Sequence, residues 1–292
     1  MKFRGHETFA IRKGWLNKGI KNIELNSGVF LGDAGNPMDV LGIGANMVKA
    51  LRYWMIATKI AEEPHSGKRK QSLTDIGTTI YRNDPYFEEM GSLALVHYGL
   101  ASNEGDATSW YIFFNEFDYI EFSEDDFQSH VKKYVRMSGN SLPSERSISD
   151  DFKCIINTYY SKPNSNNNPE DNIESPLVEL GLIEYLYSKN NIRLYKKVMI
   201  KEELLPDLIA LAIILNNADG KKELKISSLL RGKKSIGRIF NLDMVRIINI
   251  LYRLEKLGYV KVVRTAGLDI VEILTDMKYI DCIQLYYDNL NQ

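Results

Sequence analysis

The residues that could do chemistry in this sequence begin with the glycines of VLGIGANMVKALRYW, residues 40–54. Glycines spaced as Gly42 and Gly44 could form the phosphate-binding loop of a nucleotide enzyme. A dinucleotide-binding loop, however, follows a strand and needs a third glycine where this chain has Met47. The G-x-x-x-x-G-K-[ST] motif of a P-loop occurs nowhere in the sequence. The pattern therefore argues against a nucleotide cofactor.

The same stretch fits a helix-turn-helix motif, in which a turn separates a short helix from a longer one. Gly42 permits a left-handed turn, and Ile43 fills the angle between the two helices. Val48 and Leu51 are spaced to hold the second helix, which we expect over residues 45–62. In DNA-binding proteins the second helix of this motif lies in the major groove. The sequence therefore favours DNA binding over nucleotide binding for this stretch.

Polar side chains on and after this helix are the first DNA-binding candidates. Asn46 could read adenine and Arg52 could read guanine through paired hydrogen bonds, with Lys49 beside them. The segment after the helix predicts a wing, which is a β-hairpin that holds phosphates. The tip of this wing carries three cationic candidates: Lys68, Arg69 and Lys70.

The C-terminal region predicts a unit of the same kind with a more regular pattern. A third helix is expected over residues 241–258, with Asn241 as its N-cap and Gly258 as its stop. A hairpin over residues 259–274, turning at Ala266 and Gly267, follows this helix. On the helix, four apolar residues are expected to be buried: Val245, Ile248, Leu251 and Leu254. Four polar residues are expected to share the outward face: Arg246, Asn249, Arg253 and Lys256.

The charges of the sequence are distributed unevenly. Residues 221–264 carry nine more basic than acidic side chains, and residues 1–22 carry five more. Residues 83–126 carry eleven acidic side chains and no Lys or Arg. This distribution predicts basic ends that face phosphates and an acidic middle that faces another protein. In the C-terminal unit, Arg246, Asn249 and Arg253 would read bases, and four cations would clamp phosphates: Lys233, Lys234, Lys261 and Arg264.

Length and composition are those of a folded protein with two or three domains, because the chain has 292 residues, 44% hydrophobic and 26% charged. We expect a mainly α fold with small β-hairpins (α+β), built from multiple winged helix-turn-helix units and a helical middle region. The expected domains are an N-terminal arm with a winged helix over 1–85, a middle region over 86–200 and a basic winged helix over 201–292. The middle region would end in a helix capped by Ser175 and a hairpin turning at 189–191, which could be a second winged unit or half of one.

The stretch GHETF near the N-terminus leaves four alternatives open. His6 and Glu7 could be a catalytic acid–base pair, phosphate ligands together with Arg4 and Arg12, contacts to a partner subunit, or packing residues. Adjacent residues point in different directions on a helix or a strand, so the two do not easily serve one site. We expect His6 and Glu7 to hydrogen-bond an N-terminal arm to the first winged unit.

The sequence contains no recognisable catalytic, metal-binding or membrane-spanning motif. The acidic pairs 125–126 and 150–151 could bind magnesium in a nuclease, but both lie where helix-start acids are expected, with no nearby Lys at nuclease-like spacing. Cys154, Cys282 and the four histidines are too scattered for a zinc site. The longest apolar run, LIALAIILNNA, is too short to span a bilayer, and the N-terminal segment has no apolar signal core. We therefore expect a cytoplasmic protein without a cofactor or metal, not an enzyme, whose two thiols are reduced.

Four blocks of the sequence have the order and spacing of blocks in a known protein family. They are FRGHETFAIRKGWLNKG (3–19), LGIGANMVKALRYW (41–54), SWYIFFNEF (109–117) and SPLVELGLI (175–183). Together they resemble a bacterial family, domain of unknown function four-thousand-and-seven, over most of the chain. The resemblance implies no catalytic residue. It implies a genomic context beside phosphoadenosine-phosphosulfate-reductase-like sulfur-transfer genes and other genes of DNA phosphorothioation and phage defence.

Residue pattern and resemblance together predict a DNA-binding accessory or regulatory protein of a bacterial DNA-modification or phage-defence system, with duplex DNA as its partner. The rival hypothesis is a protein–protein adaptor for a reductase-like sulfur-transfer enzyme, because many winged helices bind only proteins. The acidic middle of the chain would then bind a basic partner. A metal-dependent nuclease is the weaker alternative.

Overall fold

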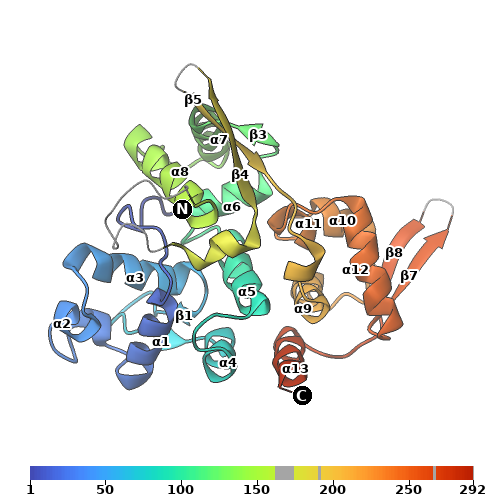
Figure 1. Cartoon of the computed structure of the whole chain (residues 1–292), viewed down its shortest axis with the longest axis horizontal. Helices are drawn as coiled ribbons and strands as arrows, with labels where there is room; N and C mark the ends of the chain where they lie inside the picture. Colours follow the sequence, from blue (N-terminus) through green and yellow to red (C-terminus); the bar gives the residue numbers. More distant parts are fainter. Residues whose placement is uncertain (162–173, 190–191, 266–267, 292) are drawn as a thin grey trace. The chain divides into compact units, whose positions relative to one another are not determined.

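The computed structural model describes residues 1–161, 174–189, 192–265 and 268–291 of the chain. The chain divides into two compact units, Met1–Val198 and Met199–Gln292, here called the first and the second unit (Figure 1). Both units combine helices with small antiparallel sheets, so the predicted mixture of helices and small hairpins is confirmed. The predicted domains 1–85 and 86–200 fall in the first unit, which ends two residues before the predicted boundary.

The N-terminal part of the first unit is a run of short helices with one two-stranded sheet. Its elements are α1 (Trp15–Leu25), η1 (Val29–Leu31), α2 (Pro37–Leu41), α3 (Ala45–Ala57), β1 (Ala61–Glu62), β2 (Ser72–Leu73) and α4 (Asp75–Asn83). Gly42 follows α2 with a φ of +59°, the left-handed turn expected between the two helices. Helix α3 ends earlier than expected, because Lys59 also takes a left-handed φ and strand β1 begins at Ala61.

The remainder of the first unit is built around two helices that are buried on all sides. Its elements are α5 (Met90–Ala101), α6 (Thr108–Asn115), β3 (Glu121–Phe122), α7 (Glu124–Met137), α8 (Glu145–Tyr159), η3 (Pro176–Leu180), β4 (Ile183–Lys189) and β5 (Ile192–Lys197). Helices α5 and α6 have almost no polar face, so other elements must cover them completely. Trp54 of α3 and Trp110 of α6 meet edge to face in this core, with ring centroids 5.4 Å apart.

Side-chain caps start two elements of the first unit, and the cap at Ser175 is the one expected from the sequence. Ser123 accepts a hydrogen bond from the backbone N–H of Asp126, whose carboxylate accepts from the N–H of Ser123, so α7 begins with a capping box. Ser175 likewise caps η3 ahead of Pro176. The expected hairpin follows η3 as β4 and β5, which pair antiparallel. Strand β5 also pairs with β3, so the strand order of this sheet is β3-β5-β4.

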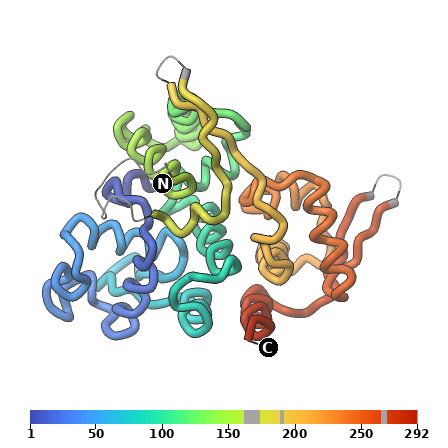
Figure 2. The backbone as a smooth tube through the Cα atoms, in the orientation of Figure 1, coloured from blue at the N-terminus to red at the C-terminus, as the bar shows by residue number. Residues whose placement is uncertain are grey.

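The second unit is a helical core covered by one three-stranded sheet. Its elements are η4 (Glu202–Leu204), α9 (Asp207–Ala218), β6 (Glu223–Lys225), α10 (Ile226–Arg231), α11 (Ile236–Ile239), α12 (Met244–Lys256), β7 (Val260–Thr265), β8 (Leu268–Ile273) and α13 (Tyr279–Leu290). The apolar helix α9 packs against α13 and α12, which cover it. The hairpin β7–β8 follows α12, and its strand β7 packs against that helix (Figure 2). In the described part of the chain, no helix is both long and apolar enough to cross a membrane.

The two units share one arrangement of strands and helices. In the first unit, the short strand β3 precedes α7 and α8, and the hairpin β4–β5 follows. In the second unit, the short strand β6 precedes α10, α11 and α12, and the hairpin β7–β8 follows. The last strand of each hairpin lies in the middle of its sheet, giving the orders β3-β5-β4 and β6-β8-β7. Of the turn predicted at 189–191, residues 190–191 lie outside the described residues, as does the whole turn predicted at 266–267.

Candidate nucleic-acid interface

Helix α12 is rotated relative to the sequence-based expectation. Val245 is 65% exposed rather than buried, and Ile248 is only half-buried. The buried positions are Ile247, Ile250, Leu251 and Leu254. The helix also begins later, because Asp243 and not Asn241 accepts the capping hydrogen bond from the N–H of Arg246. The expected burial of Val245 and the expected cap were therefore wrong, and Gly258, with a φ of +80°, ends the helix as expected.

This rotation defines the exposed face of α12. Residues at i, i+4, i+7 and i+11 lie on one side of a helix. The exposed side of α12 carries Val245, Asn249, Tyr252 and Lys256. Two of the four polar residues expected on the outward face, Asn249 and Lys256, lie there. Arg246 and Arg253 are half-buried at its edge, so the expectation that they face outward was wrong.

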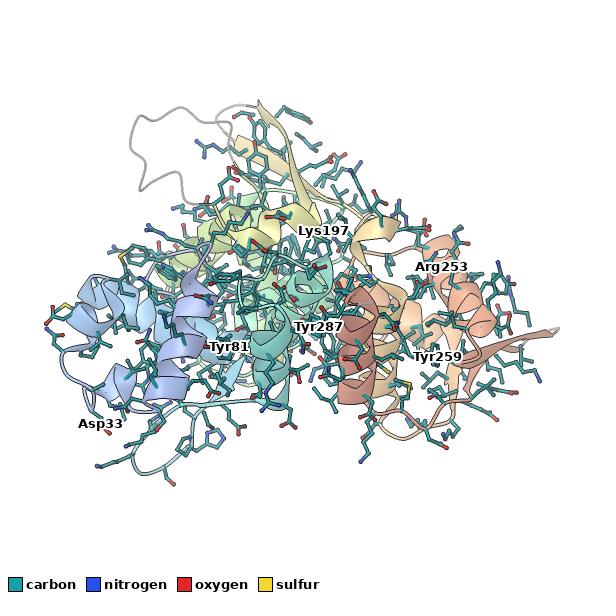
Figure 3. The ribbon with its side chains drawn as sticks, turned by 60° about the horizontal axis from the view of Figure 1, so that its bottom comes forward. Asp33, Tyr81, Lys197, Arg253, Tyr259 and Tyr287 are labelled. Atoms are coloured by element: carbon teal, nitrogen blue, oxygen red, sulfur yellow. The ribbon has the colours of Figure 1, made fainter. Side chains whose placement is uncertain are left out.

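Arg253 and Arg246 bind acceptors within the second unit. The side chain of Arg253 is labelled in Figure 3. Its Nε lies 2.9 and 3.0 Å from the two carboxylate oxygens of Asp207, and its Nη1 lies 3.2 Å from Oε2 of Glu202. Nη1 of Arg246 donates to the backbone carbonyl of Ile200. Charge-assisted hydrogen bonds of this kind hold a side chain in one position. These two guanidinium groups therefore fasten α12 to the segment that contains η4 and the start of α9.

The hairpin β7–β8 adds two of the predicted cations to the exposed face of α12. Arg264 donates to Oδ1 of Asp269 at 3.2 Å, and Asp269 and then Tyr252 raise the pKa of Arg264. Strand β7, which carries Arg264, packs against α12. Lys261 is exposed and lies 4.0 Å from Glu272, too far for a strong pair. Between α10 and α11, Lys233 is exposed and Lys234 is half-buried, where its carbonyl accepts from Asn217.

The predicted DNA-binding residues of the first unit separate into exposed and paired groups. Nη2 of Arg52 lies 2.8 Å from Oε2 of Glu63, whose other oxygen accepts from Arg69. Lys70 forms an ion pair with Asp33 at 2.7 Å. The side chains of the remaining three are exposed and form no hydrogen bond or ion pair with the described residues: Asn46, Lys49 and Lys68.

The N-terminal arm is anchored mainly on α8. The His6 ring is fully buried, and its Nε2 lies 2.7 Å from Oδ1 of Asp151. The backbone N–H of Arg4 donates to the same oxygen, and Nε of Arg4 lies 2.8 Å from Oδ2 of Asp150. The hydrogen-bonding partner expected for His6 was therefore wrong, because it belongs to α8 and not to the α2–α3 motif. The arm does also reach α3, where Nε1 of Trp54 donates to the carbonyl of Phe9.

The other arm candidates surround this buried histidine. Glu7 is half-buried with a left-handed φ of 49°, and the guanidinium of Arg12 lies over the rings of Phe9 and Trp15. The N–H of Thr8 donates to Nδ1 of His6, so the imidazole is the neutral tautomer with its proton on Nε2.

Asp151 is the centre of a closed network rather than part of a reactive site. Oγ of Ser109 donates to Oδ2 of Asp151 at 2.6 Å, while His6 donates to the other oxygen. A serine nucleophile would need its hydroxyl against the imidazole and open to substrate. Here the serine, the histidine and the carboxylate are all buried. The network holds the arm, α6 and α8 together.

A groove of about 530 Å³ in the first unit brings together residues that sequence reasoning kept apart. Asp125 lies at its rim beside Glu124, and Lys153, Asn157 and Arg193 line it from α8 and β5. Lys153 is distant from Asp125 in sequence, so spacing alone carried no signal of their proximity. The other predicted acids have structural roles, since Asp126 caps α7 and the pair 150–151 binds the arm. Among the residues that the structure describes, no three His, Cys, Asp or Glu side chains are grouped to hold a metal.

Comparisons with known proteins place the chain in a family. A search of curated proteins finds no match. A magnesium ion-bound SspB crystal structure is similar over 100% of this chain and 89% of that chain, with 27% identity and a TM-score of 0.87. An SspB crystal structure is similar over the same shares, with 28% identity and a TM-score of 0.86. The model of the family described as "Protein of unknown function (DUF4007)" matches residues 3–287, and the chain therefore belongs to that family.

Proposed function

We propose that this protein binds duplex DNA through winged helix-turn-helix modules, with α12 and the hairpin β7–β8 as its main contact surface. A winged helix consists of a helix, a short strand, two further helices and a hairpin, with the short strand at one edge of the sheet. The elements α9, β6, α10–α11, α12 and β7–β8 follow that order. In such a module the exposed face of the last helix enters the major groove.

One observation carries this proposal: strand β7 packs against α12, so the exposed face of the helix, which carries Tyr252, lies beside the hairpin strand that carries the exposed Arg264. Asn249 and Lys256 lie on the same face as Tyr252. Amide side chains read base edges, and cations bind phosphates. The internally paired Arg246 and Arg253 position the helix in this proposal and do not read bases.

The first unit offers a matching but smaller surface. Asn46 and Lys49 lie exposed on α3, which follows the left-handed turn at Gly42. Lys68 lies exposed between strands β1 and β2. We infer that these three side chains contact DNA, whereas Glu63 and Asp33 neutralise the neighbouring cations.

The biological role that fits such a surface is that of an accessory or regulatory protein of a bacterial DNA-modification or phage-defence system. This part of the proposal is supported by the context that the family resemblance implies. A phosphoadenosine-phosphosulfate-reductase-like enzyme is the partner that this context favours. The protein would then hold or direct such an enzyme on DNA.

One feature favours the adaptor hypothesis as a second function. The loop between α6 and β3 carries Tyr119 and Ile120, which are 49% and 66% exposed, beside Asp118 and Glu121. Exposed apolar side chains with acidic neighbours suit a basic protein partner. DNA binding by one surface and enzyme docking by this loop are compatible.

A metal-dependent nuclease has less support in the side chains of this chain. Magnesium is usually held by one or two carboxylates with water and substrate oxygens. Of the two carboxylates at the groove, Glu124 accepts hydrogen bonds from Ser149 and Gln128 at Oε1. Oε2 of Glu124 and the carboxylate of Asp125 remain, and among the described residues no third metal-binding side chain is grouped with them.

A salt titration of DNA binding tests the proposal. The full chain is titrated against a labelled duplex of about three helical turns, in salt from about 50 to 200 mM. The double variant Asn249→Ala/Lys256→Ala should bind more weakly, and the loss of one phosphate contact should reduce the salt slope by about 0.9. Lys21→Ala, which removes an exposed lysine of α1, is the control and should bind as the unmodified chain does. Absence of binding at the lowest salt would reject DNA binding and leave the adaptor hypothesis.

A further inference from the structure

Helix α8 of the first unit occupies the position that α12 occupies in the second. Each is the last α-helix before a hairpin, with the 3-10 helix η3 standing between α8 and its hairpin, and each hairpin places its second strand in the middle of a three-stranded sheet. No DNA-binding candidate was expected on α8 from the sequence. The equivalence therefore raises the question of what the exposed face of α8 carries.

The exposed face of α8 is a polar stripe. Arg146, Lys153 and Asn157 stand at i, i+7 and i+11, the spacing of Val245, Tyr252 and Lys256 on α12. The Arg146 side chain is 81% exposed and only 3.9 Å from Asp150, a weak pair. The side chains of Lys153 and Asn157 form no hydrogen bond or ion pair within the described ranges of the chain. Arg and Lys can read guanine, and Asn can read adenine, through paired hydrogen bonds.

The opposite face of α8 is fixed in the core. Asp151 is held by His6, Ser109 and the backbone of Arg4, and Ile148 and Ile155 are fully buried. A helix held in this way presents its polar stripe in one orientation. Such preorganisation lowers the entropy cost of binding.

The groove beside α8 is lined by side chains of the helix and of the hairpin. Lys153 and Asn157 line it from the helix, and Arg193 lines it from the hairpin strand β5. Phe152, Ile156 and Tyr195 contribute its apolar surface. The helix stripe and the hairpin cation therefore border one hollow, as a winged helix requires when its helix and wing hold the same DNA.

The acidic residues at the rim limit how DNA could lie there. Asp125 is exposed and Glu124 is half-buried at the start of α7. Carboxylates repel phosphates, so the backbone must pass on the side of Lys153 and Arg193. A carboxylate can instead accept a hydrogen bond from a cytosine amino group. The charges thus favour a path of the DNA backbone along Lys153 and Arg193, away from Asp125.

We propose that α8 and its groove form a further duplex-DNA contact, in which Arg146 and Asn157 face base pairs and Lys153 and Arg193 bind the backbone. This inference rests on the proposed function, since it adds a third contact to the same activity. The chain would then hold DNA at three places, two in the first unit and one in the second. The N-terminal arm acquires a positioning role, because His6 and Arg4 fix the helix that makes this contact.

The test compares three matched double variants of the full chain in the same salt titration. Lys153→Ala/Arg193→Ala removes the groove cations, and Lys133→Ala/Arg136→Ala removes two exposed cations of α7 outside the groove. Asn249→Ala/Lys256→Ala alters the second unit. Thermal unfolding by circular dichroism confirms that each variant is folded. We expect the groove variant to lose at least about tenfold in affinity and about two units of salt slope, with the α7 variant unchanged.

Each result decides between the two proposals. If the groove variant binds as the unmodified chain does while the α12 variant is weakened, the α8 contact is overturned and the proposed function stands. If the groove and α7 variants lose affinity equally, the effect is general charge and the α8 contact is again overturned. Absence of binding by the unmodified chain rejects both. The single variant Asp125→Asn should raise the affinity for DNA, because it removes a charge that repels phosphates. A decrease would contradict the path assigned to the DNA backbone.

Discussion

Nε of Arg253 lies 2.9 Å from Oδ1 of Asp207, and this pair fastens the last turns of α12 to the first turn of α9. Asp207 is also favourably placed at a helix N-terminus, where the helix dipole stabilises a negative charge. Nη1 of Arg253 also donates to Oε2 of Glu202 at 3.2 Å. Arg253 is thus a structural residue of the second unit, although its residue type alone suggests nucleic-acid binding.

Replacing Arg253 should therefore cost stability. Arg253→Ala removes charge-assisted hydrogen bonds to Asp207 and Glu202, and we expect the free energy of unfolding to fall by about 1.5–3 kcal/mol. Lys256→Ala, on the exposed face of the same helix, should change it by less than about 0.5 kcal/mol. Urea denaturation followed by circular dichroism measures both. An Arg253→Ala chain as stable as the unmodified one, yet defective in DNA binding, would show that Arg253 reads DNA.

The buried network around Asp151 should be more sensitive still. Asp151→Ala leaves the His6 and Ser109 donors and the Arg4 N–H without their acceptor in a buried site, which should cost about 3–5 kcal/mol. Asp150→Ala removes only a half-buried partner of Arg4 and should cost about 1 kcal/mol or less. Equal losses in the two variants, measured by denaturant unfolding, would argue against the network described here.

His130 should make stability depend on pH. Burial lowers the pKa of His130, and the nearby Lys197 charge lowers it further, against the opposing effect of Asp118 and Glu116. The folded pKa therefore lies below the usual value of about 6.5, so the unfolded chain binds the proton first as the pH falls. The contribution of neutral His130 is complete above about pH 6.5 and is lost as the pH falls through the folded pKa.

The matching experiment compares the unmodified chain with His130→Gln between about pH 7.5 and pH 5.5. Glutamine does not titrate, so the variant should lose less stability across this interval. The measured quantity is the difference between the two chains in denaturation midpoint at each pH. A difference that stays constant, or that changes in the opposite direction, would contradict the burial of His130.

Both thiols should be inert in the folded chain. Burial raises the pKa of Cys154 well above its usual range and raises the pKa of Cys282 to about 12. Because the thiolate is the reactive form, an aromatic disulfide reagent at about pH 8 should not react with the native protein. Both cysteines should react after denaturation. Rapid reaction of either thiol in the native chain would show that its segment opens readily.

Several local features were determined by the sequence itself. The turn at Gly42, the capping of α7 by Ser123 and the stop at Gly258 depend on residues within one helical turn of each other. Hydrophobic alternation likewise predicted the hairpins that became β4–β5 and β7–β8. These features hold because short-range hydrogen bonds and backbone conformation determine them wherever the segment lies in the fold.

Other features were decided only by packing between distant segments. The rotation of α12 depends on which face α9 and the sheet cover, and it placed Ile247 and Ile250 in the core instead of Val245 and Ile248. His6 hydrogen-bonds Asp151, and Lys153 lines the same groove as Arg193. The residues of each pair are far apart in the sequence, so no local sequence pattern predicted these contacts. The hydrophobic effect is non-directional, so it favours burial of apolar residues without specifying which segments pack together. Which charged side chains are paired and which face solvent therefore follows only from the folded structure.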